Sequence, residues 1–296
     1  GQGDHRHREK VDKPFYIGVF EVTQKQWELV MGKRPSFWLG SQWGMRPVEQ
    51  VTVKMIRGSA SVQANSIDAE SFIGRLRGKS GVDFDLPTET LWEYACRAGA
   101  ASDYFNGLDC TTYKKDSAVD QIGRYQHNGG WNADKWGGEF KWKIDKVDRN
   151  WGVENGSAAV GSYTANDWGL FDMHGNVYEI CLFAENRKDG RKGVAIALGG
   201  AWFSHAADCK AASATEVGSG YSGFGIGFRL CLPQAGGAAT QTPAARTPST
   251  GSIELKTGGN SPFTVKGNEA TLELKNGAKL EFVKCPSGWV KVVDDY

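Results

Sequence analysis

The spacing of apolar positions predicts a first helix directly after residue 23. Thr23 and Gln26 have the spacing of a capping box, in which each side chain satisfies a backbone N–H group of the first turn. Trp27, Val30 and Met31 then fall on one face of that helix. We therefore expect a short helix with an apolar side that begins at this cap.

Two more helices are predicted between residues 68 and 99. In the first, from residue 68 to about residue 76, four apolar residues recur at helical spacing: Ala69, Phe72, Ile73 and Leu76. The second has Thr88 as its N-cap, Glu89 in its first turn and Gly99 at its end. Its inward face carries Trp92, Ala95 and Cys96. This second pattern is the clearest helical signal in the chain.

Strands and irregular backbone are predicted for the remainder of the main body. Residues 100–167 are rich in Gly, Asn and Trp and show no period. Short apolar segments at 177–183, 194–198 and 225–232 are typical of strands, as is the run at 14–23 before the first helix.

The end of the chain divides into a linker and a β segment. Residues 234–251 are small and punctuated by Pro, which is typical of a linker. From residue 252 onward, apolar and polar positions alternate as in strands, with a type I′ turn signal at Asn276 and Gly277. Because a unit of this size buries little apolar surface, we expect it to pack onto the main domain. The predicted division is a domain at 1–233, a linker at 234–251 and a β segment at 252–296.

Composition and charge narrow the classes of function. The formal net charge is +1, from 35 basic and 34 acidic residues, so no overall field favours nucleic acid or an anionic membrane surface. No apolar run is long enough to cross a bilayer, and the first residues carry no apolar signal region. We expect no membrane span, signal or anchor in this chain. The 11 Trp and 39 Gly indicate turn-rich backbone held by large aromatic anchors.

Five motifs occur in the order found in formylglycine-generating, or sulfatase-modifying, domains, and the chain resembles that family. The motifs are FYIGVFEVTQKQWELVMG, LPTETLWEYACRAG, WGLFDMHGNVYEIC, GGAW and GFRL, and they cover about residues 14–232. The resemblance implies an α+β, C-type-lectin-like fold with little regular secondary structure.

The tail sequence NGAKLEFVKCPSGWVKV is similar to the strand that normally opens such a domain. One interpretation is a circular permutation, or an equivalent strand supplied from the C-terminus. An unrelated β appendage and the start of a tandem copy are the alternatives. Permutation requires residues 280–284 to lie against the strand at 15–22.

The resemblance also implies a chemistry, which one missing residue argues against. Enzymes of this family are copper-dependent oxidases that convert a substrate Cys to formylglycine, using two Cys five positions apart. Such a thiolate pair suits soft Cu(I). In the corresponding interval Cys209 is the single Cys, with Ser204 five positions before it and Ala214 five after. We therefore expect no copper, and interpret Cys209 as a buried residue or as a disulfide partner, for instance of Cys181 or Cys231.

A calcium site near the GNVYE motif is a second feature that the resemblance implies. Asn176 and Glu179 offer hard oxygen ligands close together in the sequence, which suits Ca²⁺. The alternative is that Asn176 caps a turn and that Glu179 pairs with an Arg in the core.

Residues 199–230 have the composition of a binding surface. Isolated aromatics alternate with small residues, with no period of 2 or 3.6. Tyr and Phe give a large contact area for few frozen torsions, while Ser and Gly adapt their hydrogen bonds, as in antibody loops. The expected ligand contacts are Phe203, Ser204, His205, Asp208, Ser213, Thr215, Val217, Ser219, Tyr221, Ser222, Phe224 and Ile226.

This stretch is also similar to the variable region of proteins diversified by retroelements, in which a reverse transcriptase rewrites the adenines of a template. Randomising both adenines of an AAC codon can give most of the interior residues, but neither Lys210 nor Glu216. The flanking motif residues would stay fixed: Gly199, Gly200, Trp202, Gly227, Phe228 and Arg229.

The sequence therefore predicts a non-catalytic ligand-binding protein with a variable surface. Its partner would be a protein or another cell-surface ligand, and it would be displayed on a bacterial cell surface or a phage particle. Two alternatives are a copper-dependent formylglycine-generating oxidase acting on a sulfatase Cys, and an invariant binding module of the same fold. Exchangeable residues must face solvent, because changing a packed core residue typically costs about 2–5 kcal/mol.

Overall fold

Helix α1, Gln24–Met31, begins at the predicted cap. In the computed structural model the Thr23 hydroxyl accepts the Gln26 N–H group, and the Gln26 side chain accepts the Thr23 N–H group at 2.7 Å. Trp27 is fully buried and stacks on Phe72. The structure describes residues 6–40, 42–58, 67–129, 156–183, 194–218, 220–232, 263–274 and 278–293.

The second predicted helix begins later than expected. Helix α3 spans Phe72–Ser80, because Ser71 is its N-cap and its hydroxyl accepts the Gly74 N–H group. The start at residue 68 is therefore wrong, and Ala69 lies in the turn before the helix. Helix α4, Glu89–Arg97, is capped by Thr88 as predicted.

Four short helical segments in the described part of the chain carry no signal that the sequence analysis used. They are η1 (Trp43–Met45), α2 (Val53–Arg57), α5 (Ser117–Asp120) and η3 (Ala206–Cys209). Each is five residues or fewer, so its helical period is too short to recognise.

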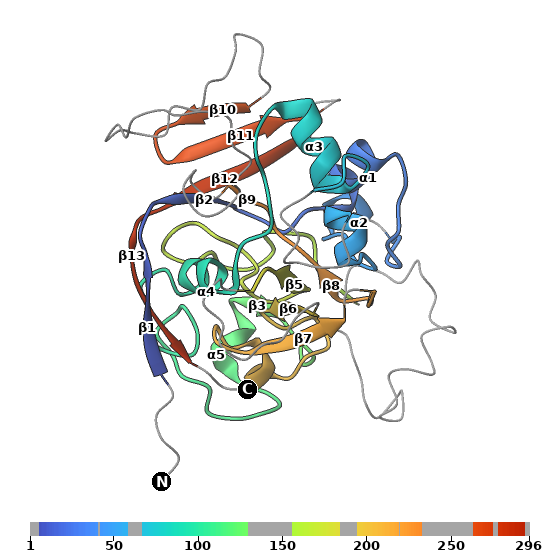
Figure 1. Cartoon of the computed structure of the whole chain (residues 1–296). Helices are drawn as coiled ribbons and strands as arrows, with labels where there is room; N and C mark the ends of the chain where they lie inside the picture. The colour runs from blue at the N-terminus through green and yellow to red at the C-terminus, as the bar shows by residue number, and fades with distance from the viewer. Residues whose placement is uncertain are drawn as a thin grey trace.

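An antiparallel sheet of five strands combines N-terminal and C-terminal segments, in the order β10-β11-β12-β2-β9. The strands are β2 (Phe15–Gly18), β9 (Cys231–Leu232), β10 (Phe263–Lys266), β11 (Glu269–Glu273) and β12 (Lys279–Cys285). Figure 1 shows the C-terminal strands β10, β11 and β12, in orange and red, with the blue strand β2 next to β12.

The C-terminal segment meets the main domain through β12 and β2. Phe282 pairs with Gly18, and Cys285 pairs with Phe15. This is the pairing that the permutation interpretation requires. A second antiparallel pair joins β1 (Arg6–Val11) to β13 (Gly288–Val293). The linker at 234–251 and the predicted turn at Asn276 and Gly277 lie outside the described residues.

A second sheet has the order β7-β6-β5-β8, and two of its strands, β7 and β8, belong to the 199–230 stretch. Its strands are β5 (Tyr178–Cys181), β6 (Val194–Leu198), β7 (Ala214–Gly218) and β8 (Ile226–Gly227). A separate parallel pair is formed by β3 (Gly123–Arg124) and β4 (His174–Gly175). The strand predicted at 225–232 is divided, because β8 belongs to this sheet and β9 to the other. Residues 228–230 therefore cross between the two sheets.

One hydrophobic core joins the two sheets. It includes Trp27, Trp92 and Phe228 from the main domain and Phe263 and Phe282 from the C-terminal segment. Within the described residues, no helix is both long and apolar enough to cross a membrane.

Candidate functional site

Arg229 anchors residues 228–230, the segment that passes from one sheet to the other. It is fully buried, and its Nε and Nη2 atoms donate to the two carboxylate oxygens of Glu179 at 2.8 and 2.6 Å. Its guanidinium also donates to three carbonyl oxygens, those of Gly18, Val19 and Phe171. The GFRL motif is thus a structural anchor of this fold.

The surroundings of Asn176 and Glu179 do not fit a calcium ion. The Glu179 carboxylate accepts hydrogen bonds from Arg229 and from the Trp92 indole at 2.6 Å, so a guanidinium already occupies the place of a cation. Asn176 accepts the Ala158 N–H group and has a positive φ of 62°. The geometry of these two residues matches the alternative, a turn residue and a core ion pair. Elsewhere in the described ranges, no cluster of three or more His, Cys, Asp or Glu could hold a metal ion.

Two further buried carboxyl groups lie near this ion pair. Burial, followed by the negative charge of Asp172, raises the pKa of Glu21 well above its usual range. Burial likewise raises the pKa of Asp172 to about 6. Glu21 Oε1 and Asp172 Oδ1 have no hydrogen-bond partner among the described residues, which favours a protonated form for at least one group.

The glycines at the start of the stretch are required by close packing. Gly199 and Gly200 have positive φ values of 87° and 78°, which L side chains rarely adopt. A Cβ atom on Gly200 would lie 2.6 Å from the Cys209 sulfur. Trp202 is buried, packs edge-on against Trp38, and donates from its indole to the Phe224 carbonyl. These residues form the frame of the stretch.

The expected ligand contacts fall into three groups by exposure. Three are exposed: Thr215, Tyr221 and Ser222. Five are half-buried: Phe203, His205, Asp208, Ser213 and Phe224. Three are buried: Ser204, Val217 and Ile226. Ser219 lies outside the described residues.

The three buried residues do not present their side chains to a partner, and each has a structural reason. The Ser204 hydroxyl accepts the Ala201 N–H group and donates to the Tyr178 hydroxyl. Val217 belongs to the core because β7 pairs with β6, and Ile226 does so because β8 pairs with β5. The requirement of solvent exposure is therefore not met at these positions.

Two aromatic residues outside the stretch adjoin it and were not predicted. The Tyr113 ring lies 4.8 Å from the His205 ring, and Tyr113 is 57% exposed. The Phe37 ring lies 4.8 Å from the Phe224 ring. A candidate surface built on this stretch therefore includes fixed residues from two other loops, which no local pattern in the sequence reveals.

The environment of the Cys209 thiol disfavours its thiolate form. Cys209 is fully buried, and burial first, then the charge of Asp208, raise its pKa above the usual range of a thiol. A copper-binding thiolate would need the opposite shift. Ser204, at the position five residues earlier, supplies a hydroxyl already used in two hydrogen bonds.

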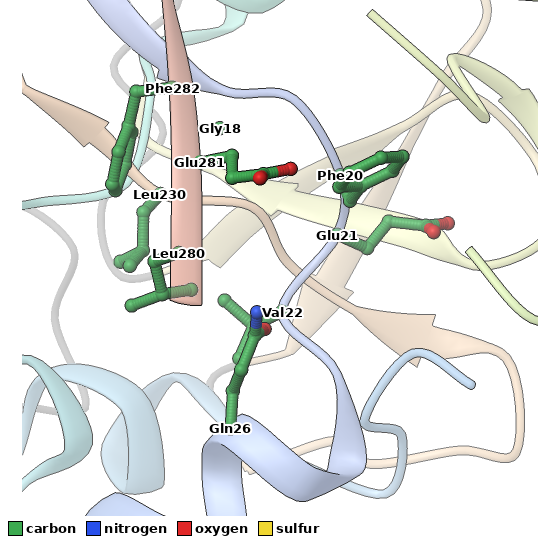
Figure 2. A pocket seen from close by; sticks show the side chains of 9 residues that line it. All are labelled: Gly18, Phe20, Glu21, Val22, Gln26, Leu230, Leu280, Glu281 and Phe282. Atoms are coloured by element: carbon green, nitrogen blue, oxygen red, sulfur yellow. The ribbon is translucent and has the colours of Figure 1, made fainter. Parts of the chain in front are cut away.

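A small pocket lies away from the exposed part of the stretch, between β12 and the residues that follow β2. Figure 2 shows its lining, with Leu280 and Phe282 on β12 and with Val22 and Gln26 below. Both polar groups of the Gln26 side chain are already hydrogen-bonded, since it donates to the Lys279 carbonyl at 2.6 Å and accepts from the Thr23 N–H group. The pocket is thus part of the seam between the C-terminal segment and the main domain.

Comparison with known proteins agrees with this geometry. The sulfatase-modifying factor enzyme 1-like domain family matches residues 2–233. The chain is 32% identical over 213 residues to "Chaperone protein LppX" of Paenibacillus barcinonensis, covering 64% of this chain and 70% of that protein. It is 36% identical over 94 residues to the formylglycine-generating enzyme of Mycobacterium tuberculosis, covering 32% of this chain and 25% of that enzyme.

Two solved structures share the fold at low sequence identity. Treponema denticola variable protein 1 is 22% identical, with a TM-score of 0.51, over 74% of this chain and 84% of that one. PvdO from Pseudomonas aeruginosa is 17% identical, with a TM-score of 0.52, over 77% and 92%. The fold is thus α+β and C-type-lectin-like, and the chain belongs to the family of sulfatase-modifying factor enzyme 1-like domains.

Proposed function

We propose that this chain is a non-catalytic binding protein whose 199–230 surface attaches selectively to a protein or another cell-surface ligand. The observation that carries the proposal is the division of this stretch. Its motif residues, such as Trp202 and Arg229, are buried and hydrogen-bonded, whereas Thr215, Tyr221 and Ser222 between them are exposed. Exposed side chains can change at a cost within about 0.5 kcal/mol, so this surface can vary while the core stays intact.

The half-buried aromatics give the surface rigid contact area. Phe203 lies edge-on to Trp202 with ring centroids 5.3 Å apart, and Phe224 lies edge-on to Phe37. An aromatic side chain already held by its neighbours loses little entropy on binding. The half-buried His205 and Asp208 add polar groups beside them.

The single thiol argues against an oxidase. Cys209 lacks a second Cys at the family spacing, and burial holds it in the protonated form. Incubation with Cu(I), oxygen and a Cys-containing sulfatase peptide tests this directly. Formylglycine produced catalytically would overturn the binding proposal.

We further propose that a retroelement diversifies the stretch and that the protein is displayed on a cell surface or a phage. Support comes from the composition of residues 199–230 and from the fold shared with Treponema denticola variable protein 1. An adenine-richer copy of these codons beside a reverse transcriptase gene is the expected genomic observation. A lone copy that is identical in sister strains would remove the basis for diversification.

A second candidate is an invariant binding module of the same fold. The 32% identity to a protein named as a chaperone favours it, because a chaperone also binds without covalent chemistry. The two candidates differ in whether residues 199–230 vary between strains.

A pair of display libraries tests the binding face itself. The first library randomises Thr215, Tyr221 and Ser222, and the control library randomises three exposed residues of β10, Thr264, Val265 and Lys266. Both should keep protease resistance near that of the parent, since all six positions are exposed. Selection against a panel of purified surface proteins should enrich specific binders from the first library. Equal enrichment from the β10 library would contradict the proposed face.

A further inference from the structure

A loop outside the 199–230 stretch is hydrogen-bonded to residues within the stretch. Residues 103–114 and 206–211 are joined by three backbone hydrogen bonds. These run from Ala206 N to Lys114 O (3.2 Å), from Ala207 N to Tyr113 O (3.0 Å) and from Ala211 N to Asp103 O (2.9 Å). The Asp103 carboxylate also accepts the Cys110 N–H group at 3.0 Å. The two segments, each with one cysteine, are therefore held side by side.

Cys110 and Cys209 meet at the same small cluster. Cys209 is part of a buried group with Tyr104 and Ala206, and Cys110 packs against that group from its outer side. The Tyr104 hydroxyl donates to the Ala206 carbonyl at 2.9 Å. Burial first, and then the nearby Cys110 side chain, raise the pKa of Tyr104. Both cysteines thus adjoin the cluster that contains Tyr104.

The two thiols differ in their access to solvent. All six cysteines lie within the described residues and are free thiols, and Cys110 alone is half-buried while the other five are buried. An external reagent therefore meets Cys110 first. The Cys110 thiol donates to the Thr112 carbonyl at 3.4 Å, a bond that one side-chain rotation would break.

We propose that Cys110 and Cys209 are a disulfide-forming pair, oxidised by exchange with a low-molecular-weight disulfide. The Cys110 sulfur attacks one sulfur of the small disulfide, whose S–S bond breaks and releases one small thiol. Cys209 then attacks the Cys110 sulfur of the mixed disulfide and releases the second small thiol. Two protein thiols are oxidised, one small disulfide is reduced, and the two protons end on the released thiols.

The bond would tie the loop that carries Tyr113 to the segment that carries His205. It closes a loop of about 100 residues, which constrains the unfolded chain more than a short loop does. The second step should be slow, because burial raises the pKa of the Cys209 thiol and leaves little thiolate. The pair does not depend on the proposed binding function, since it rests on the contacts of the two segments alone.

The test uses the reduced full chain and oxidised glutathione at about pH 8. We expect a glutathione adduct on Cys110 that gives way to an adduct-free protein lacking two hydrogens. A non-reducing peptide map should then contain one cross-linked pair, with Cys110 and Cys209. The oxidised protein should melt roughly 5 °C higher than the reduced one.

Three variants separate this pair from other thiols. Cys209→Ser should stop at the adduct on Cys110. Cys110→Ser, at a half-buried position that tolerates Ser, should form neither the adduct nor the cross-link, so the test survives if the Cys209 variant fails to fold. Cys181→Ala, at a buried thiol outside the cluster, should oxidise as the wild type does. An adduct that persists in the wild type, a cross-link to another cysteine, or the same mass loss in Cys110→Ser would overturn the proposal.

Discussion

Replacing Arg229 by Met removes the cation from a buried group of carboxyls while keeping much of the side-chain volume. The arginine makes two hydrogen bonds to Glu179 and three to the carbonyls of Gly18, Val19 and Phe171. Glu21 and Asp172 also lie close enough to feel its charge. The variant would therefore leave buried negative charge and unpaired carbonyl groups.

The expected loss of unfolding free energy follows from these contacts. Removing one partner of a buried ion pair costs about 3–5 kcal/mol, and each buried carbonyl left unpaired adds to that cost. A domain of ordinary stability has about 5–15 kcal/mol in total, so Arg229→Met should be close to unfolding at 25 °C. Urea titration followed by tryptophan fluorescence measures the change.

Two companion variants decide whether the charge is the cause. Arg75→Met removes an exposed arginine paired with Glu70, and should cost at most about 1 kcal/mol. Adding Glu179→Gln to Arg229→Met should recover at least about 1 kcal/mol, because a neutral side chain then replaces the unpaired carboxylate. A loss below about 1 kcal/mol in Arg229→Met, or no recovery in the double variant, would refute the reasoning.

Three further predictions use the same urea titration. Burial raises the folded-state pKa of Asp172 to about 6, so between about pH 4 and 6 the folded protein holds a proton that the unfolded chain has released. The resulting contribution to the free energy of unfolding is complete below about pH 4 and is lost as the pH rises to about 6. The free energy of unfolding of the wild type should therefore fall by up to about 1.4 kcal/mol per pH unit between pH 4 and 6, and Asp172→Asn should reduce this fall. An unchanged pH dependence in the variant would contradict the raised pKa of Asp172. Tyr221→Ala should change the unfolding free energy by less than about 0.5 kcal/mol and Ile226→Ala should lower it by about 2–5 kcal/mol, whereas equal losses would mean that exposure does not divide the stretch. Thr23→Ala should cost about 1 kcal/mol through loss of the capping hydrogen bond to Gln26, and a loss under about 0.3 kcal/mol would show that the cap is dispensable.

Helix starts were predictable where one side chain closes a local hydrogen bond. The Thr23 and Thr88 side chains each accept a hydrogen bond from the backbone N–H group three residues later, so the sequence contains the whole interaction. Ser71 was missed because the apolar spacing extends back to Ala69, although Ser71 competes successfully for the Gly74 N–H group. Gly74 itself packs against the Asp68 carbonyl, where a Cβ atom would lie at 2.0 Å.

Composition alone did not reveal which side chains of the 199–230 stretch face solvent. The mixture of aromatic and small residues indicated a surface, yet the same mixture contains Tyr221, which is exposed, and Val217, which is buried. Pairing of β7 with β6 decides the direction of Val217, and that pairing depends on residues outside the stretch. Tyr113 and Phe37 reach the surface from other loops, so no pattern within 199–230 could find them.

By itself, the sequence determined the family, the caps of α1 and α4, and the presence of one Cys where the family's oxidases have two. These features are local, since they depend on residue types at fixed short spacings. Tertiary structure decided that Glu179 pairs with Arg229, that β12 enters the sheet beside β2, and that Cys110 and Cys209 pack in the same cluster. Each of these depends on segments distant in the sequence, whose approach is set by burial of a shared core and by satisfaction of buried polar groups.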